Sequence, residues 1–417
     1  MTEYYDALET RDPEARRAEL LTAVAAQVRH AMAHAPGYAQ ILAGVDARDL
    51  ASFAAIAALP VTRKSELAQL QKAQPPFGGL AAHSRGAGGR LKYLFASPGP
   101  IYELAAHRDD YWRFARALFA AGIRAGDVAH NAFSYHLTPA GAMGDSGCHA
   151  LGCAVIPAGV GHTEQQVEVI RDLKPDAYLG TPSFLKILLQ KADDLGTDVS
   201  SIKKALVSGE ALPPSTRGYL DERGVTALQA YATADLGLIA YETVADHGLI
   251  IDEAVYLEIV RPGSGQVVAD GEVGEVVVTT LNPDYPLIRF ATGDLSAIMG
   301  GHSACGRTNR RIKGWMGRAD QTAKVRGMFV HPAQIEQVLQ RHREITRARL
   351  VIDWVGESDR MTLKCESPFA GGADPSLPAA IAASIRDLCK VRGEVELVEP
   401  GGLPNDGVVI EDARKYA

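Results

Sequence analysis

The sequence predicts an α/β protein with two parts: a large N-terminal domain with a parallel sheet and a small β subdomain, and a small α+β C-terminal domain. Between residues 109 and 229, short apolar runs alternate with helical patterns, which is typical of βαβ units around a parallel sheet. Residues 256–298 are rich in β-forming residues between Gly and Pro turns, which indicates a small antiparallel subdomain. The length of 417 residues exceeds one typical core and fits a large domain plus a small one.

Composition narrows the class of protein. Hydrophobic residues make up 47% of the chain and charged residues 22%, which is ordinary for a soluble globular protein. No run of apolar residues is long enough for a membrane span, and the acidic start, Met1–Asp6, does not resemble a signal peptide. The net charge of −7 argues against a nucleic-acid partner. Five cysteines without a Cys-x-x-Cys pair favour reduced thiols, so we expect a cytoplasmic protein.

The first hundred residues predict helices followed by a strand. Apolar residues recur at intervals of three and four between 13 and 42, which predicts a helix, and Pro36-Gly37 then interrupts the pattern. The run 59–67, Leu-Pro-Val-Thr-Arg-Lys-Ser-Glu-Leu, reads as a loop followed by a capped helix. Residues 92–103 predict a strand that runs into a Pro/Gly turn.

The alternating region predicts the parallel sheet. Its expected helices and strands are, in turn, 110–121, 128–133, 139–151, 154–156, 163–173, 177–180, 182–192, 205–208, 213–222 and 226–229. In such sheets, ligands bind beyond the carboxyl ends of the strands. Three expected strands end in unusual residues, at 133–141, 208–211 and 229–235. We therefore expect a ligand site at this edge of the sheet.

Two later runs carry polar groups suited to a nucleotide. In Thr292-Gly293-Asp294, the carboxylate can accept two hydroxyl hydrogen bonds, as a ribose diol would supply. Arg318, Lys324 and Arg326 surround a Gly-flanked turn, where arginine offers forked donors suited to phosphate. Each run alone also fits an ordinary surface turn or a solvated basic face. Beyond them, the expected elements of the C-terminal domain are helices 333–341 and 378–389 and strands 349–352, 361–363 and 394–398.

Together, and in this order and spacing, these runs resemble the adenylate-forming superfamily of acyl-CoA synthetases, luciferases and peptide-synthetase adenylation domains. The likeness extends over most of the chain and is greatest to the phenylacetate–CoA ligase branch. It implies an adenylate-forming domain over residues 1–319, a mobile lid domain over 320–417, and a hinge at Asp320. It also implies ATP, Mg²⁺ and coenzyme A as cofactors.

The resemblance assigns roles in the nucleotide site. It implies that Asp294 holds the ribose and that Arg318 contacts ribose and phosphate. It also implies that Tyr231 stacks on adenine, that Thr233 touches phosphate, and that Asp235 holds Mg²⁺ through a hard oxygen ligand. The residues alone also allow Tyr231 to be half-buried core, with Thr233 and Asp235 capping a following helix. The full expected nucleotide set is Ser97, Gly99, Ser208, Gly209, Glu210, Ala211, Ala230, Tyr231, Ala232, Thr233, Asp294 and Arg318.

Two departures from the family pattern concern adenylation. The expected phosphate loop keeps Ser97 and Gly99. However, Gly99 is flanked by two prolines, which have no N–H donors, and the loop contains no lysine. A phosphate loop and a purely structural turn therefore remain alternatives. Near the C-terminus, Val408 stands where the family has a catalytic lysine, and Lys415 is the only nearby amine. We take Arg318 and Lys415 as the candidate catalytic residues.

The family's acyl pocket corresponds to the stretch after the strand 128–133. The candidate lining residues are Phe133, Tyr135, His136, Ala140, Gly141 and Ala142. The small residues leave room for a flat ring, although a lone histidine at such a place also fits a hydrogen-bonded scaffold. Zinc-binding relatives carry several cysteines and a histidine near the β subdomain. Here only His247, His302 and Cys305 are available, so we expect no zinc.

The resemblance implies an ATP-dependent ligase that activates an aromatic carboxylic acid as its acyl-adenylate and passes it to coenzyme A, with a possible homodimer. The electrophile would be activated by charge neutralisation at phosphate, chiefly by Mg²⁺ and Arg318. Two alternatives stay open: a non-catalytic or half-reaction homologue that binds nucleotide or acyl-adenylate, and transfer of the acyl group to a carrier-protein thiol.

Overall fold

The computed structural model describes residues 3–83, 90–262, 265–319, 321–355, 358–370, 376–404 and 408–414. Asp320 and Lys415, the expected hinge and one expected catalytic residue, lie outside the described residues. The chain divides into two compact units, Met1–Met316 and Gly317–Ala417, and the division falls just before the run Gly317-Arg318-Ala319-Asp320. The expected fold class is confirmed: the large unit holds a parallel sheet and a small β subdomain, and the small unit is α+β.

The N-terminal helical stretch is two helices. Helix α1, Pro13–His34, begins at Asp12, whose carboxylate accepts hydrogen bonds from the backbone N–H groups of Glu14 and Ala15. The single helix expected to reach residue 42 stops at Ala35, which is extended, and α2, Pro36–Ile41, follows. Proline disfavours helical backbone at the preceding residue, which accounts for the break. Short elements follow: η1 Ala7–Thr10 before α1, and then η2 Ala47–Asp49, α3 Phe53–Ala57, β1 Thr62–Arg63, η3 Lys64–Glu66 and α4 Leu67–Ala73.

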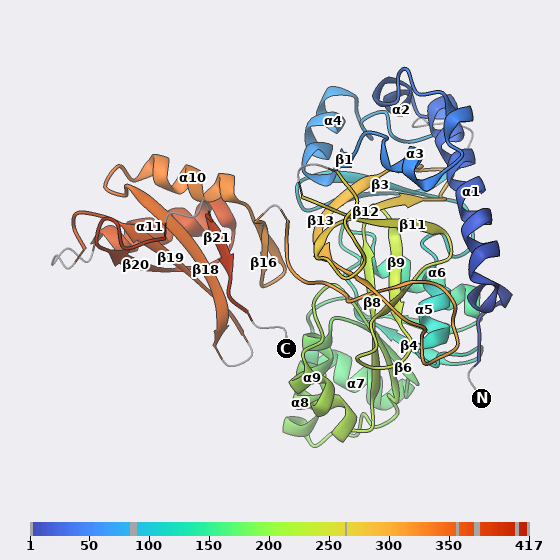
Figure 1. Ribbon diagram of the computed structural model, residues 1–417. Helices are drawn as coiled ribbons and strands as arrows, with labels where there is room; N and C mark the ends of the chain where they lie inside the picture. The colour runs from blue at the N-terminus through green and yellow to red at the C-terminus, as the bar shows by residue number, and fades with distance from the viewer. Residues whose placement is uncertain are drawn as a thin grey trace. The chain divides into compact units, whose positions relative to one another are not determined.

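The large sheet has nine strands in the order β14-β15-β10-β9-β8-β7-β6-β4-β5 (Figure 1). Strands β4 to β8 pair in parallel, as expected, and the remaining pairings are antiparallel. The bounds are β4 Val128–Asn131, β5 Ala154–Pro157, β6 Ala177–Gly180, β7 Lys204–Val207, β8 Thr226–Thr233, β9 Gly237–Glu242, β10 Leu249–Ile251, β14 Ile298–Met299 and β15 Arg311–Ile312.

Helices cover both faces of the parallel strands. They are α5 Phe114–Ala120, α6 Ala140–Leu151, α7 Thr163–Leu173, α8 Pro182–Leu195 and α9 Pro214–Glu222. Successive residues of β6 enter different cores: Tyr178 packs with α7 to α9, and Leu179 packs in the main cluster with α5 and α6. Because side chains alternate along a strand, the two cores lie on opposite faces of the sheet.

Two expectations in this region are wrong. The helix expected from residue 110 begins only at Phe114, because Asp110 and Arg113 have φ values of 44° and 65°, outside the helical range. The Arg113 guanidinium instead donates to the backbone carbonyls of Leu236 and Leu238. Strand β8 continues past residue 229 and turns directly into β9, so residues 230–235 cap no helix.

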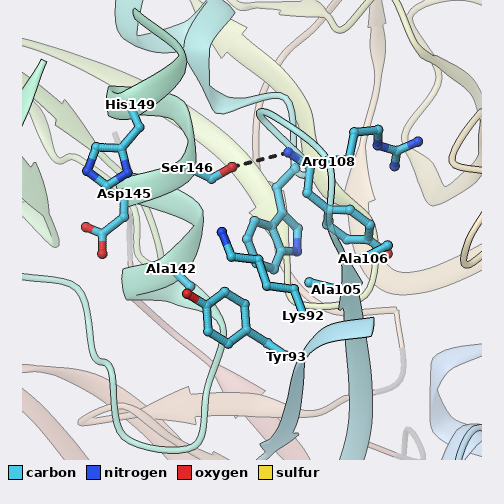
Figure 2. A pocket seen from close by; sticks show the side chains of 11 residues that line it. Lys92, Tyr93, Ala105, Ala106, Arg108, Ala142, Asp145, Ser146 and His149 are labelled. Atoms are coloured by element: carbon cyan, nitrogen blue, oxygen red, sulfur yellow. Dashed lines mark hydrogen bonds between the residues drawn. The ribbon is translucent and has the colours of Figure 1, made fainter. Parts of the chain in front are cut away.

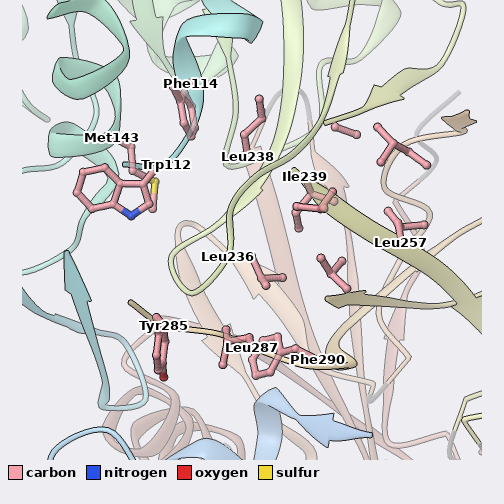
Figure 3. Packing of buried hydrophobic residues seen from close by; sticks show 14 of the residues in the cluster. Trp112, Phe114, Met143, Leu236, Leu238, Ile239, Leu257, Tyr285, Leu287 and Phe290 are labelled. Atoms are coloured by element: carbon pink, nitrogen blue, oxygen red, sulfur yellow. The ribbon is translucent and has the colours of Figure 1, made fainter. Parts of the chain in front are cut away.

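The small β subdomain is a sheet with the order β1-β13-β12-β11. Strands β11 Val255–Val260, β12 Gly274–Thr280 and β13 Phe290–Ser296 are antiparallel, and β1 joins β13 in parallel. Figure 3 shows Leu238 of β9, Phe290 of β13 and Trp112 among the residues of one buried cluster. That cluster fixes the subdomain against the large sheet. Inside the subdomain, Arg289 and Glu258 form a buried two-point ion pair, with atoms 2.9 and 3.1 Å apart.

The strand expected from residue 92 is half of a hairpin. Strands β2, Leu91–Ser97, and β3, Ile101–Ala106, pair in antiparallel fashion around the Pro-Gly-Pro turn.

The C-terminal unit is confirmed as α+β. Helices α10, Pro332–Arg341, and α11, Ser376–Cys389, pack into one core with a sheet of order β20-β19-β18-β21. The strands of this unit are β16 Ala323–Val325, β17 Met328–Val330, β18 Arg347–Val355, β19 Ser358–Glu366, β20 Glu394–Val398 and β21 Ile410–Asp412.

Candidate functional site

Asp294 is the centre of a polar cluster at the end of β13. Its Oδ2 accepts a hydrogen bond from the Tyr231 hydroxyl at 2.8 Å, and its Oδ1 accepts one from Trp315 Nε1 at 3.1 Å. The Tyr231 hydroxyl also lies 3.2 Å from Thr292 Oγ1, which in turn donates to the carbonyl of Val276. These bonds join the predicted Tyr231 and Thr-Gly-Asp motifs, which lie on different sheets. They fix the orientation of the carboxylate while leaving it lone pairs for further donors.

The expected stacking residue Tyr231 is only partly buried, and its hydroxyl is used to hold Asp294. Trp315 was missed by the sequence reasoning. It lies 21 positions beyond Asp294, outside any strand pattern, and no local signal marks it.

The turn after β7 joins the same edge of the sheet. Ser208 Oγ donates to the carbonyl of Ala230 at 2.7 Å, and Gly209 has a φ of +86°, which favours glycine. Glu210 Oε1 accepts from the backbone N–H of Ser183 at 2.8 Å, so it lies at the first turn of α8. Thr233 Oγ1 accepts from the backbone N–H of Leu236 and shapes the β8–β9 turn. Of the other expected members, Ala230 is buried, and Ala211 and Ala232 are half-buried.

A second cluster contains Asp235, the expected magnesium ligand. Its Oδ2 pairs with Lys64 Nζ at 2.6 Å, and its Oδ1 is buried without a hydrogen-bond partner among the described residues. Nearby on β3 is Glu103, which the sequence reasoning missed and whose Oε2 accepts from Ser97 Oγ at 2.9 Å. Burial, then the negative charge of Asp235, raises the pKa of Glu103 to about 8. The orphaned Asp235 oxygen fits a cation, since hard carboxylate oxygens are the usual protein ligands of Mg²⁺.

Ser97 and Gly99 therefore lie on a hairpin rather than on an open loop. The Ser97 hydroxyl is directed to Glu103, and Gly99 has a φ of +154° in the turn between two prolines. The hairpin is compatible with both alternatives that the sequence left open, a phosphate loop and a purely structural turn.

The expected acyl pocket is organised around Tyr135. Its hydroxyl donates to Asp145 Oδ1 at 2.6 Å, and its ring lies against Gly141, where an added Cβ would be 2.7 Å from ring carbons. The expectation that small residues leave room for a substrate ring is thus wrong at Gly141, because Tyr135 fills that space. Phe133 is buried, whereas the backbone N–H of His136, an exposed residue, donates to Ser134 Oγ.

A cavity of about 100 Å³ lies between α6 and the β2–β3 hairpin (Figure 2). Ala142, Asp145 and His149 line it from α6, and Lys92 and Trp112 line it from the segments opposite. Ala142 is thus the expected acyl-pocket residue that borders an open volume. Ala140 and Ala142 both pack against the main core.

In the C-terminal unit, the basic turn is held by local contacts. The Arg318 guanidinium lies 6.0 Å from the centre of the Phe329 ring, and Lys324 Nζ lies 5.9 Å from it. The backbone and side chain of Arg326 donate to Asp359, so Arg326 fixes β19 to this turn. Val408 is half-buried and precedes β21.

In the described part of the chain, no group of three or more His, Cys, Asp or Glu residues could hold a metal ion. No helix there is long and apolar enough to cross a membrane.

Comparisons with known proteins match both units. The family described as AMP-binding enzyme matches residues 147–282, and the family described as AMP-binding enzyme C-terminal domain matches residues 327–410. A phenylacetate–coenzyme A ligase from Aromatoleum evansii is 31% identical, over 89% of this chain and 88% of that protein. The enzyme of the same name from Thermus thermophilus is 31% identical, over 96% of each chain.

Among solved structures, a 2-hydroxyisobutyryl-CoA ligase in complex with 2-HIB-AMP and CoA superimposes with a TM-score of 0.82. It is 24% identical in sequence and covers 98% of this chain and 92% of its own. This likeness supports the fold.

Proposed function

The chain belongs to the AMP-binding enzymes, within the phenylacetate–coenzyme A ligase group, and we propose that its acid substrate is aromatic. As a member of this group it is an AMP-forming acid–thiol ligase. It activates a carboxylic acid with ATP to an acyl-adenylate and transfers the acyl group to coenzyme A. The relatives named for phenylacetate support the aromatic substrate.

The observation that carries the nucleotide assignment is the convergence on Asp294. Tyr231 and Trp315 each donate to a different oxygen of this carboxylate and so hold it in one orientation. A fixed carboxylate can receive a diol in two hydrogen bonds without reorganising. We assign Asp294 to the ribose hydroxyls, and the Ser208–Ala211 turn and Tyr231 to the adenine.

The phosphate end is assigned to the second cluster and to Arg318. Asp235 would hold Mg²⁺, and the ion would supply positive charge to neutralise the phosphates during adenylation. Lys64 keeps one oxygen of Asp235 engaged, so the metal would take the other oxygen. From the family resemblance, we assign Arg318 to the phosphate and Asp320 to the hinge.

The acid is assigned to the region around Tyr135 and the cavity beside Ala142. Tyr135 is 38% exposed, and its ring presents an aromatic face next to helix α6. Aromatic walls and small residues suit a flat acyl group. All five cysteines are free and buried, which fits our further proposal of a cytoplasmic enzyme.

Pyrophosphate exchange across a panel of acids tests the substrate. We expect exchange with aryl acids such as phenylacetate and benzoate to exceed exchange with alkyl acids of similar size. Adding coenzyme A to the enzyme-bound acyl-adenylate should then release AMP, whereas adding a carrier protein with its thiol should not. Equal exchange with alkyl acids would contradict the aromatic assignment.

The half-reaction alternative depends on Val408. A positioned amine on developing phosphoryl charge typically contributes about 3–4 kcal/mol, which valine cannot supply. We expect slow adenylation, with a faster rate in Val408→Lys. If the candidate Lys415 does not compensate for Val408, Lys415→Ala leaves the rate unchanged. Normal parental adenylation that Lys415→Ala abolishes would instead identify Lys415 as the catalytic amine.

A further inference from the structure

We propose that Glu103 and Asp235 together hold a divalent cation, so that the β2–β3 hairpin supplies a second carboxylate to the metal site. The inference rests on the proposed function, because Asp235 is assigned to Mg²⁺ there. It goes beyond that function because Glu103 belongs to none of the motifs that define the nucleotide site.

The two carboxylates are matched in their surroundings. Glu103 is 2% exposed and Asp235 is 6% exposed. Each has one oxygen engaged by a protein donor: Ser97 Oγ at 2.9 Å for Glu103, and Lys64 Nζ at 2.6 Å for Asp235. Each also has one oxygen, Glu103 Oε1 and Asp235 Oδ1, that is buried with no hydrogen-bond partner in the described structure.

Unsatisfied buried acceptors are costly. A buried polar group without a partner typically costs about 1–3 kcal/mol, and more when it is charged. Two such oxygens occur on carboxylates close enough for the charge of Asp235 to act on Glu103. A cation bound by both oxygens, with the proton of Glu103 released to solvent, would satisfy them at once. A protein donor already occupies the other oxygen of each residue.

The oxygens also suit a particular ion. Mg²⁺ and Mn²⁺ prefer hard oxygen ligands, and Mg²⁺ is usually bound by one or two carboxylates with water and substrate phosphates completing the shell. No third His, Cys, Asp or Glu joins the pair in the described chain, which leaves positions for water and phosphate. The pair therefore has the composition of a nucleotide-assisted site rather than of a closed structural one.

Replacing Lys64 should change the cation affinity in the opposite direction from replacing either carboxylate. Its ammonium group, paired with Asp235, repels a second cation at the same carboxylate. Removing that charge should tighten cation binding, whereas removing either carboxylate should weaken it. A purely structural ion cluster would show no such opposition.

The test uses Mn²⁺ as the probe with the full-length protein and no nucleotide. Electron paramagnetic resonance of free Mn²⁺ gives the affinity, and we expect one site per chain. Glu103→Gln and Asp235→Asn should each weaken it by roughly 10–100-fold, the range seen even for outer-shell changes. Lys64→Ala should strengthen it. Glu66→Gln, an exposed acid of the same segment, is the matched control and should change nothing.

Absence of Mn²⁺ binding by the parent, or parental affinity in Glu103→Gln, would overturn the inference. If circular dichroism shows that Glu103→Gln does not fold, the Mn²⁺ affinity of Glu103→Asp is measured instead. Because shortening a true ligand weakens binding, this variant should also bind Mn²⁺ more weakly than the parent. Pyrophosphate exchange by the parent separates this result from the proposed function. Exchange without the Mn²⁺ site refutes only the role of Glu103, and a Mn²⁺ site without exchange refutes only the ligase assignment.

Discussion

Replacing Asp294 with alanine should weaken ATP binding without unfolding the protein. The carboxylate is 9% exposed and is held by Tyr231 at 2.8 Å and Trp315 at 3.1 Å, so its direction is set before nucleotide arrives. Each hydrogen bond from a ribose hydroxyl to this charged acceptor contributes about 1.5–3 kcal/mol. Since about 1.4 kcal/mol corresponds to a factor of ten, loss of even one bond predicts at least a tenfold rise in Kd.

Titration calorimetry of ATP against the parent and Asp294→Ala measures this directly. Tyr231→Phe keeps the carboxylate but removes one of its orienting donors, so its effect should be smaller, on the order of 0.5–1.5 kcal/mol. Asp270→Ala is the matched control, because it removes an exposed acid that pairs with Arg310. An unchanged ATP affinity in a folded Asp294→Ala protein would refute the ribose assignment.

Three further predictions concern stability and the acyl pocket. The pKa of Glu103 is about 8 in the folded protein, above its usual 4.5. As the pH rises between these two values, the protonated Glu103 side chain therefore loses its stabilising contribution to the free energy of unfolding, by up to about 1.4 kcal/mol per pH unit. In urea unfolding with a chelator present, the free energy of unfolding of Glu103→Gln should therefore increase relative to that of the parent from pH 5 to pH 8. A difference that stays constant with pH would contradict this. Arg289→Met should cost about 3–5 kcal/mol in urea unfolding by stranding Glu258, and adding Glu258→Leu should recover most of it. Gly141→Ala should displace the Tyr135 ring at a cost of about 1–3 kcal/mol, raising KM for the acid while ATP affinity stays constant in calorimetry.

The parallel sheet was predictable because it depends on local pattern. Strands β4 to β8 are short apolar runs between helices, and their order along the chain allows few topologies. The run Thr292-Gly293-Asp294 could be singled out by its residue types, although it lies within strand β13 and not in a surface turn. The orienting bond from Trp315 was not predictable, because it depends on how the chain returns to the site after β15.

Other errors arise where tertiary contacts override local preference. Arg113 adopts a left-handed conformation inside an expected helix, and its guanidinium binds Asp252 and two backbone carbonyls of the β8–β9 hairpin. Gly141 reads as space for a substrate, but the structure uses that space for Tyr135. The residues that Arg113 contacts are distant in sequence. The Tyr135 ring that packs against Gly141 is near in sequence, but composition alone does not show that it occupies this space.

The two ends of the proposed nucleotide site differ in how far they follow the family pattern. We therefore expect substitutions at one end to change mainly ATP affinity and substitutions at the other end to change mainly the rate of adenylation. At the ribose end, Asp294 and Tyr231 keep the expected residues and meet by direct hydrogen bonds. At the proposed phosphate end, two of the residues after Ser97 are prolines without N–H donors, and Lys64, Asp235 and Glu103 form a polar cluster. Ribose contacts stabilise bound ATP and the transition state alike, so changing them alters Kd more than kcat. Charge at phosphate develops during adenylation, so changes to the cluster should appear mainly in kcat.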